Sequence, residues 1–379
     1  MFLVGLVARA RLLKLAPQIF KARHFLNYRS MENISQFLTG ASITNLLGLI
    51  LHHGVERRFW LRAVEAIMCS LLLAPFYFLE SLSVRIVPRP LVRPAPVFVI
   101  GHWRSGTTYL HYLLSKDKQF ACCTNVDAFT PGSLFVGRWL LRKIIAMRLP
   151  KKRPMDDVNL EPTTPQEDEF PMMLLTPYSF YHAFAFPRNI KERFFKYVVF
   201  DPQNVDLICR WKKSYYEYLV RLSNRYNNKR LLLKNPVNTA RIKHIIGLFP
   251  NAKFIYIHRA PTEVKLSTVR MFKALIAANC LQTLDETELA AQVELGHKSL
   301  IREYENHRYH VAENNLVEVS YDELLHQPFD TLKKIYETLE LKEFDKTKEA
   351  FKQFIAEQKR YKPFEYSNQS NVRNAMKNS

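Results

Sequence analysis

The residues best suited to chemistry form the run GHWRSGTT, Gly101–Thr108. A short apolar, β-rich run, Val97–Ile100, precedes it, and a helical pattern of leucines follows it. The backbone N–H groups of a glycine-bounded loop and the positive end of the next helix together form a cradle for an anion. The sequence therefore predicts an anion-binding loop, with Ser105 and Gly106 in its wall, between a strand and a helix.

The composition of this loop indicates which anion it binds. A loop for a nucleoside triphosphate normally reads GxxxxGK[ST], where the lysine contacts the β- and γ-phosphates and the hydroxyl binds Mg²⁺. Here Thr107 takes the place of that lysine, and the positive charge lies inside the loop, at Arg104. A donor with a single activated anionic group, used without a metal, fits these residues better than ATP.

Further polar residues stand at the ends of other predicted strands. Lys234 ends the apolar run RLLLK, Arg259 directly follows the run KFIYIH, and Ser267 lies in the segment after it. In an open α/β sheet the carboxyl ends of the strands form the ligand crevice. We therefore expect these three side chains to face the same side of the sheet as Arg104.

The elements that position these residues alternate between strand and helix beyond residue 95. Such alternation is typical of an α/β fold with a parallel sheet and helices on both faces, in three layers. We expect strands at 97–100, 230–234, 253–258 and 316–320, and helices at about 210–227, 239–249, 262–279, 287–312 and 322–339.

Composition limits the class of protein. The chain has 379 residues, of which 47% are hydrophobic and 24% charged, as in a folded protein. Its formal net charge of +20 implies acidic partners such as a nucleotide or an anionic membrane. The five cysteines have no metal-ligand spacing, which favours reduced thiols in a reducing compartment, the cytoplasm. No nucleic-acid-binding module accompanies the charge, so we expect no nucleic-acid partner.

The chain divides near residue 95 into a basic, apolar, helical N-terminal region (1–94), a main domain (95–366) and a polar tail (367–379). The first region contains twelve Lys and Arg but four Asp and Glu. Its apolar run 66–79 is interrupted by Pro75 and is shorter than the ~20 residues of a membrane-spanning helix. Attachment to a membrane surface is favoured for this run, with a buried helical cap or a true span as alternatives.

Four segments together resemble one family: GHWRSGTT, LLLKNPVNTARI, YIHRAPTEVKLS and VSYDELLHQP. They are similar to the nucleotide-dependent sulfotransferases, in particular the subgroup with an RSGTT-type loop and an acidic segment of the PQEDEF type, which here is Pro165–Phe170. The resemblance covers roughly residues 95–366. It implies 3′-phosphoadenylyl sulfate as co-substrate and transfer of its sulfuryl group to an acceptor hydroxyl or, less favoured, an amine.

The resemblance also implies roles for single residues. The loop that begins at Gly101 would hold the 5′-phosphosulfate, with Arg104, Thr107 and Thr108 in direct contact. Arg259 and Ser267 match the site of the 3′-phosphate; a bidentate guanidinium and a hydroxyl donor both suit that group. Lys234 matches a lysine near the bridging oxygen, where it would offset charge on the leaving phosphate.

An acceptor alcohol must lose its proton, so a base is expected within hydrogen-bond reach. Glu167 is the first choice, because the apolar residues that follow it would make a carboxylate a better proton acceptor. Its rivals are other polar side chains near the loop or in the acidic segment: Glu169, Asp168, His102 and His182. The alternative is that the acidic segment is simply the start of a helix, with Pro165 in its first turn.

Three positions, in two segments, depart from the family pattern. Asn235 and Asn238 stand in KNPVNTARI, where KSPxHTARI is common, and Asn238 cannot accept a proton at neutral pH. Trp103 precedes Arg104 where proline is common, which would reshape one wall of the cleft.

The acceptor is less directly marked. Aromatic and apolar residues at 129–149 and 178–186 predict a hydrophobic cleft, although aromatic core packing would explain the same pattern. With the basic N-terminal region, this favours an amphiphilic acceptor, such as a lipid or sterol-like alcohol, over a carbohydrate. A kinase-like phosphoryl transferase and a non-catalytic membrane- or nucleic-acid-binding protein are the alternatives from other classes. A kinase-like transferase would need a lysine at position 107, where this chain has Thr107. A non-catalytic binding protein would leave the motifs unexplained.

Overall fold

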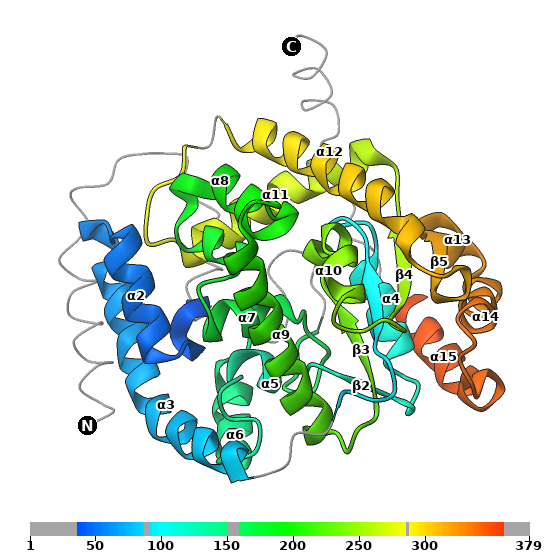
Figure 1. The fold of residues 1–379 in the computed structure, drawn as a ribbon, viewed down its shortest axis with the longest axis horizontal. Coiled ribbons are helices and arrows are strands. Elements are labelled where there is room, and N and C mark those ends of the chain that lie inside the picture. The colour runs from blue at the N-terminus through cyan, green and yellow to red at the C-terminus, as the bar shows by residue number, and fades with distance from the viewer. Residues whose placement is uncertain (1–35, 87–90, 151–158, 286–287, 360–379) are drawn as a thin grey trace. The chain divides into compact units, whose positions relative to one another are not determined.

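The computed structural model describes residues 36–86, 91–150, 159–285 and 288–359. Its centre is a sheet of five parallel strands in the order β2-β3-β1-β4-β5 (Figure 1). The strands are β1 (Val97–Ile100), β2 (Phe120–Cys122), β3 (Arg230–Lys234), β4 (Lys253–His258) and β5 (Leu316–Ser320). The four predicted strands are confirmed with their bounds. Strand β2 is additional, since so short a run shows no alternating pattern.

The sheet is buried on both faces. Alternate strand residues enter two separate cores: Phe98, Leu231, Leu233 and Phe254 face one, and Val97, Val99, Leu232 and Ile255 face the other. Successive residues of a strand point to opposite faces, so each face needs its own layer of helices. The predicted α/β class with three layers is therefore confirmed.

The helices fill the two outer layers. The smaller core is closed by α4 (Thr107–Leu114), α13 (Tyr321–His326), α14 (Pro328–Thr338) and α15 (Phe344–Lys359). The larger core contains side chains of α2 (Ile43–His53), α3 (Trp60–Ile86), α7 (Glu169–Leu175), α8 (Ile190–Phe194), α9 (Val205–Arg225), α10 (Ile242–Ile246), α11 (Pro261–Asn279) and α12 (Leu289–His307). Two helices, α5 (Asn125–Phe129) and α6 (Arg138–Arg148), follow strand β2.

Four predicted helices have different bounds. The helix predicted at about 210–227 is α9, which begins at Val205 and ends at Arg225. The predicted helix 322–339 is divided into α13 and α14 at Gln327, because a residue before proline avoids helical geometry. The predicted helix 239–249 is a 3₁₀ turn, Pro236–Ala240, followed by the short α10. The predicted helix 287–312 ends at His307, where a 3₁₀ turn follows.

Helix α3 extends well beyond the predicted apolar run and passes through Pro75. Its inner side is buried at Ala63 and Ala66, whereas Leu72 is 65% exposed, so the helix is not a fully buried cap. By length and composition it is the one helix in the described part of the chain that could cross a membrane. Attachment to a membrane surface stays a prediction.

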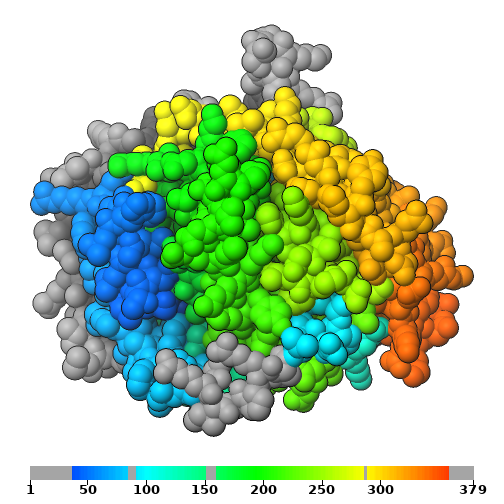
Figure 2. Space-filling view, in the orientation of Figure 1, coloured from blue at the N-terminus to red at the C-terminus, as the bar shows by residue number. Residues whose placement is uncertain are grey.

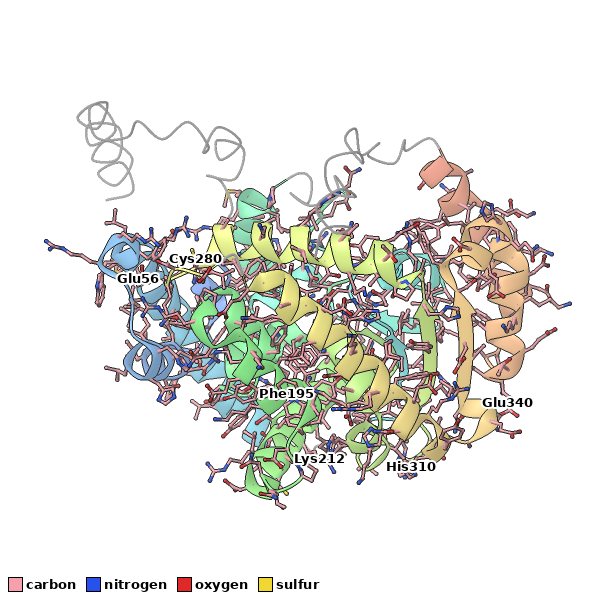
Figure 3. The ribbon with its side chains drawn as sticks, turned by 90° about the horizontal axis from the view of Figure 1, so that it is seen from above. Glu56, Phe195, Lys212, Cys280, His310 and Glu340 are labelled. Carbon is pink, nitrogen blue, oxygen red and sulfur yellow. The ribbon has the colours of Figure 1, made fainter. Side chains whose placement is uncertain are left out.

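The turn between α2 and α3 lies against the end of α11, where Figure 3 shows Glu56 close to Cys280. The Glu56 carboxylate accepts a hydrogen bond from the backbone N–H of Thr283 at 2.7 Å, and Arg62 donates to the carbonyl of Cys280 at 3.2 Å. The described N-terminal helices thus belong to the same compact unit as the sheet. The predicted boundaries at residues 94 and 366 stay predictions, and the predicted tail 367–379 lies outside the described residues.

Glu80 joins α3 to the segment that leads into α6. Its carboxylate is 1% exposed and accepts hydrogen bonds from the backbone N–H groups of Leu134, Phe135 and Val136, at 3.1, 3.1 and 3.0 Å. A buried carboxylate is stable only where donors replace its water, and these three amides do so.

We expect Glu80→Gln to lower the free energy of unfolding by about 1–3 kcal/mol, because a neutral amide with one acceptor atom faces three donors. Urea unfolding followed by tryptophan fluorescence measures the change. Glu65→Gln, at an exposed position of the same helix, is the matched control and should leave stability unchanged. Equal effects of the two substitutions would contradict the role given to Glu80.

Candidate active site

The predicted anion-binding loop lies between β1 and α4, at the carboxyl edge of the sheet. Gly101, Arg104 and Gly106 have positive φ angles of 142°, 68° and 100°. The Ser105 hydroxyl donates to the carbonyl of His102 at 2.8 Å and closes the turn. Such alternation of backbone conformations turns successive N–H groups inward and makes a concave anion site. The predicted loop between a strand and a helix is thus confirmed, and the binding of an anion in it stays a prediction.

Neighbouring elements hold this loop at both ends. Thr239 Oγ1 accepts a hydrogen bond from the Gly101 N–H at 2.8 Å and donates to the Gly101 carbonyl at 3.1 Å. At the other end, a Cβ atom at Gly106 would overlap the ring of Tyr321, the first residue of α13. Gly106 is required here both for its backbone conformation and for this close approach.

One side of the loop carries three of the predicted donor-binding residues. Arg104 Nε donates to Ser267 Oγ at 2.9 Å, which joins the loop to α11. The guanidinium of Arg259 lies 4.6 Å from the centre of the Tyr321 ring and pairs with Glu263. That pair is 32% and 59% exposed, so it costs little to exchange for another anion.

The opposite side of the loop carries a buried lysine. Lys234, the last residue of β3, is 2% exposed; its Nζ donates to Thr108 Oγ1 at 3.2 Å and forms an ion pair with Glu167. Burial and, as a smaller cause, the charge of Lys234 lower the pKa of the neighbouring His111 to about 3. A positive charge is thus held beside the loop in a region of low dielectric, where electrostatic interactions are strong.

Glu167 connects this lysine to the aromatic core. One carboxylate oxygen pairs with Lys234 and the other accepts a hydrogen bond from the hydroxyl of Tyr181. Tyr181 in turn accepts a hydrogen bond from the indole N–H of Trp103 at 3.2 Å. Sequence analysis missed Tyr181 as a site residue, since it lies in an aromatic run and no spacing distinguishes it from its neighbours.

The other two carboxylates of the acidic segment point away from the loop. Asp168 is fully buried, and its Oδ2 accepts hydrogen bonds from Tyr215 at 2.5 Å and Asn238 at 3.2 Å. Burial raises the pKa of Asp168 to about 6, against the effect of these hydrogen bonds. Asn238, which departs from the family pattern, therefore makes a buried hydrogen bond to Asp168 beneath the site.

Glu169 makes a buried ion pair with Arg241, at 2.7 Å, and both side chains are 0% exposed. It also accepts hydrogen bonds from Ser179 at 2.7 Å and from Asn235 at 2.8 Å. With its oxygens satisfied inside the protein, Glu169 has the contacts of a structural residue, and its candidacy as a base stays a prediction. Helix α7 begins at this residue, so Pro165 is not in its first turn.

The two histidine candidates are also buried, although His102 belongs to the loop itself. Burial lowers the pKa values of His102 and His182 to about 3. His102 lies 4.7 Å from the ring of His297 and lines a cavity of about 20 Å³, room for a single water. His182 contacts the carbonyl oxygen of Met173 at 2.7 Å. Both rings are buried, and their candidacy as a base stays a prediction.

The aromatic run 178–186 is largely core. Phe180, Tyr181, Phe184 and Phe186 are at most 2% exposed. Phe180 packs against Trp103 and Phe272, and Phe184 also packs against Phe272. The sequence alone leaves two explanations for this run, a hydrophobic acceptor cleft and core packing. Core packing explains these four side chains, which do not line an open cleft.

These features define a sulfotransferase. Residues 96–346 match the sulfotransferase family, and the chain belongs to that family, as its motifs predict. The omega-hydroxy-beta-dihydromenaquinone-9 sulfotransferase Stf3 of Mycobacterium bovis is 30% identical over 285 residues, which cover 74% of this chain and 72% of that protein. Its namesake in Mycobacterium tuberculosis gives the same values.

Solved structures show the same fold. Sulfotransferase STF9 from Mycobacterium avium superposes with a TM-score of 0.61 at 18% identity, over 86% of this chain and 89% of that one. Sulfotransferase STF1 from Mycobacterium tuberculosis gives a TM-score of 0.56 at 17% identity, over 90% of this chain and 91% of that one.

We expect Glu169→Gln to destabilise the protein by about 3–5 kcal/mol, because Arg241 is then left buried without a compensating charge. Asp206→Asn, which breaks the exposed pair with Arg210, is the control and should leave stability unchanged. Urea unfolding measures both. If Glu169→Gln is as stable as the unmodified protein but inactive, Glu169 belongs to the chemistry after all.

Proposed function

We propose that this enzyme transfers the sulfuryl group of 3′-phosphoadenylyl sulfate to a hydroxyl of an amphiphilic, lipid-like acceptor, without a metal. The observation that supports this most is the placement of Lys234, Thr108 and Glu167 in contact beside the anion-binding loop. Such a site has a fixed positive charge for the leaving group and a carboxylate for the acceptor proton, with the loop between strand and helix for the donor anion.

The donor would be held on both sides of the loop. The cradle from Gly101 to Thr108, with Arg104, Ser105, Gly106 and Thr107, takes the 5′-phosphosulfate. Arg259 and Ser267 take the 3′-phosphate. Two contacts support this division: Ser267 is bonded to Arg104 of the loop, and Arg259 lies on the ring of Tyr321, which itself covers Gly106. The exposed partner of Arg259, Glu263, is readily exchanged for a phosphate.

In the reaction, the acceptor oxygen forms a bond to sulfur while the bond from sulfur to the bridging oxygen breaks. The electron pair of that bond leaves with adenosine 3′,5′-bisphosphate, and Lys234 offsets the charge that develops there. The acceptor proton goes to Glu167, whose side chain is 14% exposed and therefore reachable. As Lys234 turns to the leaving group, its hold on Glu167 weakens and the carboxylate becomes a better base.

A lipid-like acceptor is favoured over a carbohydrate. The relative named above is a sulfotransferase for a dihydromenaquinone, and the acidic segment here is followed by the apolar residues of α7. The basic, apolar N-terminal region is consistent with an enzyme that works in the cytoplasm at a membrane surface, where such acceptors reside. Sulfation of a carbohydrate is the second candidate, since aromatic side chains also stack on sugars.

We expect Arg259→Ala to weaken the binding of adenosine 3′,5′-bisphosphate by about 1.5–3 kcal/mol, the value of a lost charge-assisted contact. Adenosine 5′-phosphosulfate, which lacks the 3′-phosphate, should lose far less. Isothermal titration of both nucleotides against the variant and the unmodified protein measures the difference. Equal losses for both would remove Arg259 from the 3′-phosphate site.

We expect Glu167→Gln to lower turnover by about 10²–10⁴-fold, because the amide keeps its size but cannot accept the proton. Nucleotide affinity should be unchanged, and the low-pH limb of the rate profile should disappear.

Lys234→Ala should lower turnover by about 10²–10³-fold through loss of transition-state charge stabilisation. EDTA should have no effect on either protein.

The assay uses labelled donor with extracted lipids, sterols and glycans as acceptors. Retained activity in Glu167→Gln would move the base to another residue. Activity that is lost with EDTA and restored by Mg²⁺ would contradict the metal-free mechanism. Transfer to glycans alone would replace the lipid-like acceptor by a carbohydrate.

A further inference from the structure

The outer face of α3 is apolar where an ordinary surface helix is polar. Its exposed large apolar side chains follow helical spacing along one stripe: Leu61, Val64, Met68, Leu71, Leu72, Phe78, Leu79 and Leu82. Between residues 66 and 82 the one charged side chain is Glu80, which is buried. At 1.5 Å per residue the stripe is about 30 Å long. An exposed apolar face of this extent marks an interaction surface.

The opposite face of α3 is packed against protein. Ala63, Ala66 and Ser70 are buried, and the hydroxyl of Tyr77 donates to the carbonyl of Gly40 at 2.6 Å. The Glu80 carboxylate is anchored by three backbone amides of residues 134–136. A helix with protein along one side and a buried charge near its end cannot be surrounded by lipid. The apolar stripe of α3 is therefore exposed only on the side that faces away from the protein.

Helix α6 extends this surface. A Cβ atom at Gly137, just before α6, would overlap the ring of Phe76 in α3, and Arg148 at the far end of α6 donates to Sγ of Cys69 at 3.3 Å. The start of α6 thus lies near Phe76 and its end near Cys69, so the two helices run in opposite directions. Trp139 and Met147 of α6 are 71% and 77% exposed and add to the apolar face. In Figure 2, α2 and α3 (blue) form a continuous part of the surface.

The border of this surface is basic. Helix α6, RWLLRKIIAMR, has four basic residues and no acidic one. Arg142, Lys143 and Arg148 are exposed, and the ammonium of Lys143 lies 3.7 Å from the centre of the Trp139 ring. Basic side chains beside exposed tryptophan and leucine are typical of helices that lie in the interface of an anionic membrane.

We infer that the outer faces of α3 and α6 form a docking surface that inserts into one leaflet of an anionic lipid bilayer, with both helices parallel to the membrane plane. A second copy of the chain fits this surface less well, because it would bring two basic borders together. The inference depends on surface residues outside the candidate active site, and its test contains no sulfate donor, so its outcome is independent of the proposed reaction.

The test is flotation of the full-length protein with vesicles of phosphatidylcholine alone or mixed three to one with phosphatidylglycerol. The protein should float with the mixed vesicles. The double variant Leu72→Ser, Trp139→Ser should lower the partition coefficient by about tenfold or more, because two apolar side chains no longer enter the bilayer. Arg142→Gln, Lys143→Gln should lower it by about tenfold on the mixed vesicles but leave binding to phosphatidylcholine unchanged.

The matched control is Val205→Ser, Tyr309→Ser, which removes apolar side chains that are 62% and 82% exposed elsewhere. It should float like the unmodified protein. A second measurement needs no destabilising change: brominated lipid in the mixed vesicles should quench tryptophan fluorescence, and Trp139→Phe should reduce that quenching. This readout decides the question even if the double variant fails to fold.

Three results would overturn the inference. The first is equal flotation of the Leu72→Ser, Trp139→Ser variant and its control, together with no quenching of Trp139. The second is a stable dimer in sedimentation equilibrium that the variant dissociates, which would assign the surface to a second copy. The third is retention of the cellular protein in membranes after alkaline carbonate extraction, which would indicate a span.

Discussion

The buried ion pair between Glu169 and Arg241 is the interaction on which the geometry of the site depends. Both side chains are fully inaccessible, and the carboxylate also accepts hydrogen bonds from Ser179 and Asn235. An unpaired charge in this position would be costly, so the start of α7 has little freedom to move. Glu167, two residues earlier, is thereby presented to Lys234. Glu169, the structural carboxylate, thus positions Glu167, the proposed base.

A second constraint comes from the parallel sheet. Strands β3, β1 and β4 are neighbours, and all end at the same edge. Lys234, the anion-binding loop and Arg259 follow these three ends. No long connection is needed to bring the donor-binding groups together, because parallel strands place their carboxyl ends side by side.

The surface that we propose to face a membrane and the candidate active site are joined by the short helix α5. Arg138 at the start of α6 pairs with Asp127 of α5 at 2.5 Å. At the other end of α5, Asn125 accepts a hydrogen bond from Gln166 at 3.0 Å, and Gln166 directly precedes Glu167. These contacts connect α6, part of the proposed docking surface, to the segment that holds the Glu167 carboxylate.

Local pattern in the sequence was sufficient for four of the five strands, the loop and the family. Strand runs such as RLLLK and KFIYIH are bounded by the residues that end them, and the glycines of the loop need backbone conformations that few other residues adopt. Tertiary structure alone decided the roles within the acidic segment. Glu167, Asp168 and Glu169 are adjacent and chemically alike, and they differ because Lys234, Tyr215 and Arg241 meet them from distant parts of the chain. Long-range contacts of this kind leave no local signal, so Tyr181 and the antiparallel packing of α3 and α6 were also beyond the reach of sequence.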